Sequence, residues 1–129
     1  MKILLVEPEK APERIEISGD LESMQEIVGG SIQAIYPFDE PIALICSEEG
    51  KLDGLPLNRA LRDEDGKIYD VITGTFFLCG APSEEESFTS LSENQLEELE
   101  IRFHTPELFL RLNGRLVTMP LFRSAPDQI

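Results

Sequence analysis

The polar residues with the strongest claim to a binding role lie in the turn-rich stretch from Glu48 to Arg59. Paired acids, a lysine and an Asn-Arg step interrupt apolar runs here, and loops on a rigid scaffold often carry function. We therefore predict a ligand or partner site formed by Glu48, Glu49, Lys51, Asn58 and Arg59. Its chemistry would be charge pairing and hydrogen bonding. Turn formation and surface solvation are the alternative explanation of the same residues.

Residues that usually catalyse reactions are sparse in this chain. Cys46 and Cys79 lie in apolar runs, which is typical of buried free thiols, and His104 lies near a predicted helix C-terminus, where a cation is favoured. The sequence contains no Gly-x-Ser-x-Gly elbow and no glycine-rich phosphate loop. Its cysteines and histidine are too scattered for a zinc site. We predict no catalytic residue, cofactor or metal, and an enzyme is the least favoured class.

The net charge disfavours one broad class of function, direct binding to nucleic acid. The chain has 25 acidic and 11 basic residues, so its net charge is −14. Such a surface repels phosphates, so we expect no direct binding to nucleic acid. Acids concentrate between residues 83 and 100, where Glu93, Glu97 and Glu100 are predicted to form an acidic interaction face. Apolar runs are too short for a secretion signal or a membrane span, so we expect a cytoplasmic protein without membrane contact.

Hydrophobic periodicity and turn residues predict the elements that position these groups. Asp20 is the expected N-cap of a helix that Gly29-Gly30 ends, and Ser92 with Gln95 forms a capping box for a second helix. The expected strands are 2–7, 14–17, 31–36, 41–46 and 71–79, and the expected helices are 20–28 and 92–103. Residues 48–62 are expected to form turns, with a single helical turn around 57–61.

The clearest local prediction is a C-terminal β-hairpin. Asn113-Gly114 tolerates the positive φ angles of a two-residue turn, which pairs Leu112 with Arg115, Leu110 with Val117 and Leu108 with Met119. These pairs create a largely apolar face. The element order predicts a single α+β domain with a mixed or largely antiparallel sheet, covered by helices on one face.

Three motifs resemble the domain-of-unknown-function family 3846 of bacteria and phages. They are the Leu-x-x-hydrophobic-Gln-x-Ile-Val-Gly-Gly-x-Ile-Gln pattern at 21–33, the Glu-Glu-Gly-Lys-Leu-x-Gly-Leu-Pro-x-Asn-Arg pattern at 48–59, and Asp-x-Ile-x-Gly-Thr-Phe at 70–76. The resemblance covers about residues 1–80, and residues 81–129 look like an extension seen in Firmicutes members. It implies an origin in phages or conjugative elements but supplies no functional residue.

The favoured interpretation is an accessory or adaptor protein that binds a protein partner. One variant of it is an acidic mimic of DNA that blocks a DNA-binding enzyme. A second class of function is a small-molecule or nucleotide-binding domain that uses the Glu48–Arg59 loop. A concave, partly apolar pocket beside that loop would distinguish the second class. The oligomeric state is left open.

Overall fold

The structure, a computed structural model, describes residues 1–122 and contains two helices and nine strands over that range. In chain order these are β1 (Lys2–Val6), β2 (Glu13–Glu16), α1 (Leu21–Val28), β3 (Ile32–Ile35), β4 (Ile42–Ser47), β5 (Leu57–Arg62), β6 (Ile68–Thr73), β7 (Phe76–Gly80), α2 (Glu93–Arg102), β8 (Glu107–Leu112) and β9 (Arg115–Pro120). The predicted α+β class is confirmed.

Five strands form the central sheet in the order β2-β1-β7-β4-β3, and each neighbouring pair is antiparallel. The three inner strands, β1, β7 and β4, are apolar on both faces. Leu44 and Leu78 pack on one side of the sheet, while Ile45 and Phe77 pack on the other. Continuous apolar runs such as residues 42–46 are typical of strands buried on both faces.

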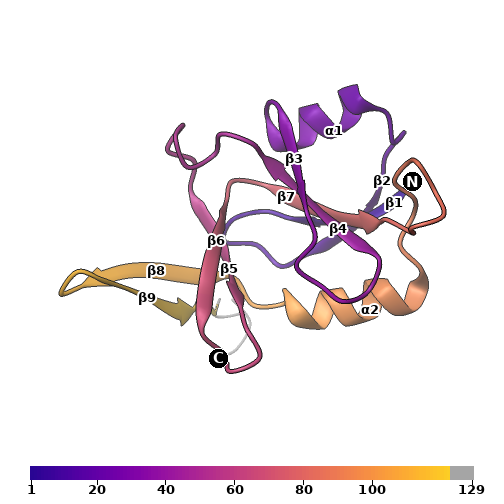
Figure 1. Ribbon diagram of the computed structural model, residues 1–129. Coiled ribbons are helices and arrows are strands. Elements are labelled where there is room, and N and C mark those ends of the chain that lie inside the picture. The colour runs from indigo at the N-terminus through magenta and orange to yellow at the C-terminus, as the bar shows by residue number, and fades with distance from the viewer. Residues whose placement is uncertain (123–129) are drawn as a thin grey trace, which may run out of the picture.

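The two helices cover opposite faces of this sheet (Figure 1). Met24 and Val28 of α1 join one core, and Leu96 and Leu99 of α2 join the other core together with residues from β5 and β6. The expectation that helices cover a single face is therefore wrong. Because the inner strands are apolar on both sides, each face needs a cover.

Helix ends follow the predicted local chemistry. Asp20 accepts a hydrogen bond from the Ser23 amide at the start of α1, and Gly29 ends that helix with a φ of 81°. At α2, the Ser92 side chain accepts from the Gln95 amide while the Gln95 side chain accepts from the Ser92 amide. Both predicted caps are confirmed.

Two predictions between residues 57 and 80 are wrong. Residues 57–61 lie in strand β5, not in a helical turn, and β5 pairs with β6 as a separate two-stranded sheet. The run expected as one strand at 71–79 is divided between β6 and β7, which belong to different sheets. Gly74, with a φ of 72°, lies at the break. Its left-handed conformation lets the chain leave one sheet and enter the other.

The C-terminal hairpin has the predicted register. Leu112 pairs with Arg115, Leu110 with Val117 and Leu108 with Met119. Asn113 and Gly114 have φ angles of 51° and 77° at the turn, as a type I′ hairpin requires. The hairpin extends away from the central sheet (Figure 1). Over residues 1–122, neither helix is long and apolar enough to cross a membrane.

Candidate functional site

A small cavity lies between the edge of the central sheet and strand β6. Its volume is about 230 Å³. It is lined by Gln33 and Ile35 of β3, Cys46 and Ser47 of β4, residues 48–52 of the β4–β5 loop, and residues 70–73 of β6. Three of the five predicted site residues, Glu48, Glu49 and Lys51, therefore border a common cavity.

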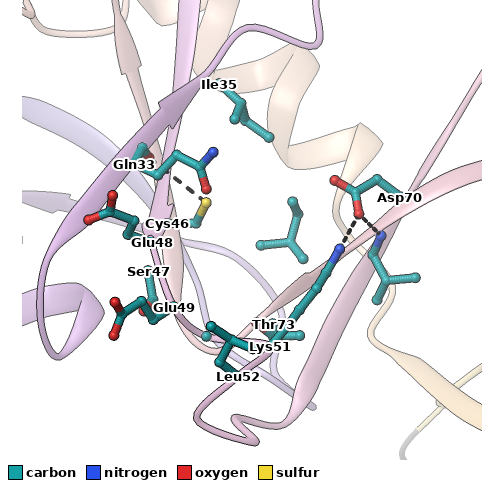
Figure 2. Close-up of a pocket in the computed structure, with 13 residues that line it drawn as sticks. Gln33, Ile35, Cys46, Ser47, Glu48, Glu49, Lys51, Leu52, Asp70 and Thr73 are labelled. Atoms are coloured by element: carbon teal, nitrogen blue, oxygen red, sulfur yellow. Dashed lines mark hydrogen bonds and ion pairs between the residues drawn. The ribbon is translucent and has the colours of Figure 1, made fainter.

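The polar wall of this cavity is an ion pair between the loop and β6. Lys51 Nζ lies 2.6 Å from Asp70 Oδ1, and the same oxygen accepts a 2.8 Å hydrogen bond from the Val71 amide (Figure 2). In this view the Glu48 and Glu49 carboxylates lie across the cavity and point away from the ion pair. The pair is accessible to solvent, so it contributes little to stability.

Neither cysteine is activated for chemistry. Cys46 lies at the cavity, where burial and the nearby Asp70 raise the pKa of its thiol, and the thiol donates to the Gln33 carbonyl over 3.8 Å. Burial raises the pKa of Cys79 to about 12. Both thiols are free and buried, as predicted. A nucleophilic cysteine needs a lowered pKa, so these side chains serve as core residues. His104 is exposed and follows the C-cap of α2.

Asn58 and Arg59 do not belong to the cavity. They lie in β5 with 0% and 1% of their surface exposed, so no ligand can reach them from solvent. The Asn58 amide donates to the carbonyls of Val6 (2.9 Å) and Gly74 (2.8 Å). Their burial corrects the prediction that Asn58 and Arg59 belong to an exposed binding loop. Asn58 instead joins β5 to β1 and to the break at Gly74.

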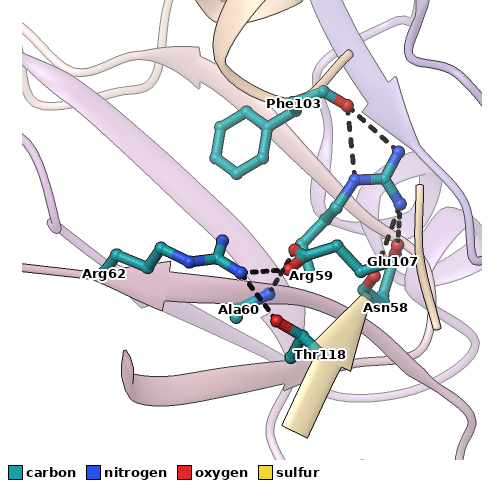
Figure 3. Close-up of polar contacts among 7 residues, drawn as sticks. All are labelled: Asn58, Arg59, Ala60, Arg62, Phe103, Glu107 and Thr118. Atoms are coloured by element: carbon teal, nitrogen blue, oxygen red, sulfur yellow. Dashed lines mark hydrogen bonds and ion pairs between the residues drawn. The ribbon is translucent and has the colours of Figure 1, made fainter. Parts of the chain in front are cut away.

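The Arg59 guanidinium is held mainly by neutral oxygens (Figure 3). It donates to the carbonyls of Phe103 (3.1 and 3.3 Å) and Lys10 (2.6 Å), and to Oδ1 of Asn58 (2.8 Å). Within residues 1–122 it forms no salt bridge. Burial lowers the pKa of Arg59, an effect that Glu107 opposes. Its role is to hold the C-terminal end of α2, where a cation is favoured.

The acidic face of α2 is partly neutralised. Arg14 on β2 reaches Glu93 and Glu100, each over 2.6 Å. These hydrogen bonds raise the pKa of Arg14 and lower the pKa of Glu100. Glu97 is exposed and forms no ion pair within the described part of the chain. The three predicted residues share one helix, but two of them already have a cationic partner.

We expect Arg14→Gln to lower stability at neutral pH and to have less effect in acid. The pKa of Glu100 is lowered in the folded state, so its contribution is present above its unfolded pKa, about 4.3. That contribution is lost as the pH falls through the folded pKa. Urea unfolding of both proteins at several pH values measures the difference. Arg111→Gln, which removes an exposed arginine that has no ion pair within residues 1–122, serves as the control. A difference that grows in acid would contradict this assignment.

The base of the hairpin is fixed to β5, whereas the remainder projects. Glu107 accepts hydrogen bonds from the Ala60 amide (2.9 Å) and from Arg62 (2.5 Å), and Arg62 also donates to Thr118 (3.0 Å) (Figure 3). The apolar residues of the outward face are Leu108, Leu110, Leu112, Val117 and Met119. All except Val117 are at least 36% exposed.

Sequence reasoning predicted this apolar face but did not place it among the site residues. It also missed Asp70 and Thr73, which line the cavity. Asp70 is a carboxylate just before an apolar strand run, which is a recognisable signal. Thr73 gives no such signal, because threonine is an ordinary strand residue. No group of three or more His, Cys, Asp or Glu residues in the described range is arranged to hold a metal ion.

Comparison with known proteins identifies a family. No curated protein and no solved structure matches the chain significantly. The family model described as "Domain of unknown function (DUF3846)" matches residues 1–104. The match extends past the limit near residue 80 suggested by the motifs, and it includes α2 but ends before the β8–β9 hairpin. The chain therefore belongs to the DUF3846 family.

Proposed function

We propose that this chain is a cytoplasmic accessory protein of a phage or other mobile element, and that it binds a protein partner through the outward face of the β8–β9 hairpin. The observation that carries the proposal is the exposure of this apolar face. Leu108, Leu112 and Met119 are 41%, 55% and 49% exposed. Two free, buried thiols are consistent with a reducing compartment.

The hairpin is a small element that a covering partner surface would stabilise. A two-stranded hairpin is only marginally stable by itself, and a third layer or further strands usually stabilise it. Here Glu107 and Thr118 fix one end to Arg62 of β5, while the leucines of the opposite face are 36–55% exposed. Binding of an apolar partner surface would remove them from water, which is the main favourable term in most protein association.

Charge indicates the chemistry of the partner. Arg111 and Arg115 lie near the hairpin turn, are exposed, and form no ion pair within residues 1–122. They stand out in a chain of net charge −14. An apolar protein surface bordered by acidic side chains complements this hairpin and would be steered toward it.

The position of the hairpin in the chain supports the same proposal. The family match ends at residue 104, and the hairpin begins at Glu107. The hairpin thus lies outside the matched residues, which supports a partner particular to this chain. The acidic DNA mimic has less support, because Arg14 already neutralises part of the face that it requires.

The test is site-specific photocrosslinking in host cells. A photoreactive amino acid at Leu112 is expected to yield one predominant crosslinked protein, whereas the same group at Glu64, an exposed turn residue, is expected to yield none. Leu110→Ser should reduce the Leu112 crosslink, because it removes apolar contact beside the probe. Arg111→Glu together with Arg115→Glu should also reduce it, since both reverse the charge at the turn.

Two outcomes would count against the proposal. Equal crosslinking from Leu112 and Glu64 would mean that the hairpin face has no special affinity for a partner. Crosslinks solely between copies of this chain would assign the face to self-association. A melting measurement on Leu110→Ser controls for unfolding, because the leucine is 36% exposed and its loss should change stability little.

A further inference from the structure

The cavity between β3, β4 and β6 lies apart from the hairpin, and several of its polar atoms have no partner among residues 1–122. We infer that it binds a small organic cation, an ammonium or guanidinium group on a short aliphatic stem. The source would be either a free amine or the side chain of a basic peptide. This inference is independent of the proposed role of the hairpin.

The first observation is a buried hydroxyl that has no partner among the described residues. Thr73 is 6% exposed, lines the cavity, and makes no side-chain hydrogen bond within residues 1–122. In this range every side-chain oxygen or nitrogen that is sealed from solvent has a partner, so the Thr73 hydroxyl keeps some contact with solvent, and Thr73 lines the cavity. The hydroxyl lies against Gly50, where an added Cβ would collide with it. The Thr73 hydroxyl is therefore an acceptor in a defined position for a ligand N–H group.

The second observation is the free oxygen of Asp70. Oδ1 is occupied by Lys51 and by the Val71 amide, whereas Oδ2 accepts no hydrogen bond from the described residues. Figure 2 shows this second oxygen on the side of the carboxylate that faces Gln33 across the cavity. The Gln33 amide points inward from β3 in the same view and has no side-chain partner in the described range. Acceptors therefore converge from two strands.

Charge and size select the ligand class. Three carboxylates, Glu48, Glu49 and Asp70, border the cavity, and Lys51 is the single base among its lining residues. A nucleotide is disfavoured, because Lys51 is already paired and the remaining charge repels phosphate. The volume of about 230 Å³ is below the usual range for drug-sized ligands, about 300–1,000 Å³. The cavity fits a single cationic group with a short stem, which Ile35 and Ile72 can contact.

The test is a titration of the ¹⁵N-labelled protein with n-butylammonium and n-butylguanidinium, followed by amide chemical shifts. We expect saturable shifts confined to residues 33–35, 46–52 and 70–73, which line the cavity. Butyrate and 1-butanol, which have the same stem without the positive charge, should give none. Similar shifts with butyrate, or no saturation with either cation up to its solubility, would overturn the inference.

Three variants sharpen the test. Asp70→Asn should weaken binding about tenfold or more, as expected for a lost charge-assisted hydrogen bond, and Thr73→Val should weaken it roughly fivefold. Lys51→Met removes the resident cation and should tighten binding about threefold. A site for anions would instead lose binding with Lys51→Met. Glu26→Gln, an exposed acid on α1, is the control, and melting curves verify that each variant is folded.

The two sources of the cation can be separated with one further probe. A tripeptide with a central lysine and capped ends presents the same ammonium group on a peptide backbone. Binding at least tenfold tighter than n-butylammonium would assign the cavity to a basic side chain of a partner protein. Equal or weaker binding would assign it to a free amine. Failure of both probes, with an intact hairpin crosslink, would reject this site and leave the proposed function standing.

Discussion

Replacing Arg59 by alanine is expected to lower the free energy of unfolding by about 3–5 kcal/mol. The guanidinium is 1% exposed and donates to the carbonyls of Phe103 and Lys10 and to the Asn58 side chain. Alanine leaves the buried acceptors of Phe103 and Asn58 without this donor, and each such loss costs about 1–3 kcal/mol, whereas the part-buried Lys10 carbonyl loses less. The substitution also removes the cost of burying the Arg59 charge, which offsets part of the stability lost with these hydrogen bonds. Equilibrium unfolding in urea measures the change.

Arg111→Ala is the matched control for this substitution. Arg111 is exposed and has no ion pair among the described residues, so its loss should change stability by less than about 0.5 kcal/mol. Arg59→Lys keeps the charge but cannot reproduce the planar fork of donors, so we expect it to recover only part of the loss. An effect of Arg59→Ala below about 1 kcal/mol would show that the buried contacts do not support the fold.

Arg59 matters because it connects segments that are far apart in sequence. Its partners Lys10 and Phe103 lie 49 and 44 residues away. The Phe103 carbonyl lies at the end of α2, where helix carbonyls lack internal partners. The guanidinium therefore completes the helix end and fixes it to β5. This explains why an Asn-Arg step that looked like a surface contact is a structural part of the interior.

Local chemistry was sufficient to predict the elements that depend on neighbouring residues. The Ser92–Gln95 capping box and the Asn113-Gly114 turn each involve groups three or fewer residues apart. The turn also fixes the hairpin register, because a two-residue loop allows a single pairing of the flanking strands. These elements were therefore predicted correctly from composition and spacing.

Long-range contacts account for the failures. A helical turn was expected at residues 57–61, but pairing with β6 makes this segment a strand, and tertiary pairing overrides weak local propensity. The division at Gly74 depends on which sheet each half joins, and the sequence around it carries no sign of that choice. Likewise, polarity alone could not distinguish Lys51, at the cavity, from Arg59, in the core.

The same difference between local and long-range contacts explains why only part of the cavity lining was predicted. Glu48, Glu49 and Lys51 are contiguous in one loop, so their proximity follows from sequence. Asp70 and Thr73 come from β6, and the pairing of β5 with β6 brings that strand to the cavity. The hairpin's apolar face was predicted from its register, but only the structure shows that nothing within residues 1–122 buries it.

The second large effect is expected at Phe103, whose ring anchors α2 to the central sheet. The side chain is 3% exposed, and its ring centroid lies 5.6 Å from that of Phe76 and 6.2 Å from that of Phe38, edge-on in both cases. Phe103→Ala removes these contacts and leaves a cavity, so we expect a loss of about 3–5 kcal/mol. Phe122→Ala, at a residue that is 77% exposed, should change stability by about 0.5 kcal/mol or less.

The Phe103 and Arg59 substitutions remove different interactions from one anchoring point. Arg59 binds the Phe103 carbonyl, whereas Phe76 contacts its ring. If both contacts hold the same helix end, the first substitution releases it and the second then costs less. The double variant should therefore lose at least about 1 kcal/mol less than the two single losses added together. Simple additivity in urea unfolding would mean that ring packing and carbonyl binding stabilise the fold independently. In that case Arg59 would act chiefly through Lys10 and Asn58.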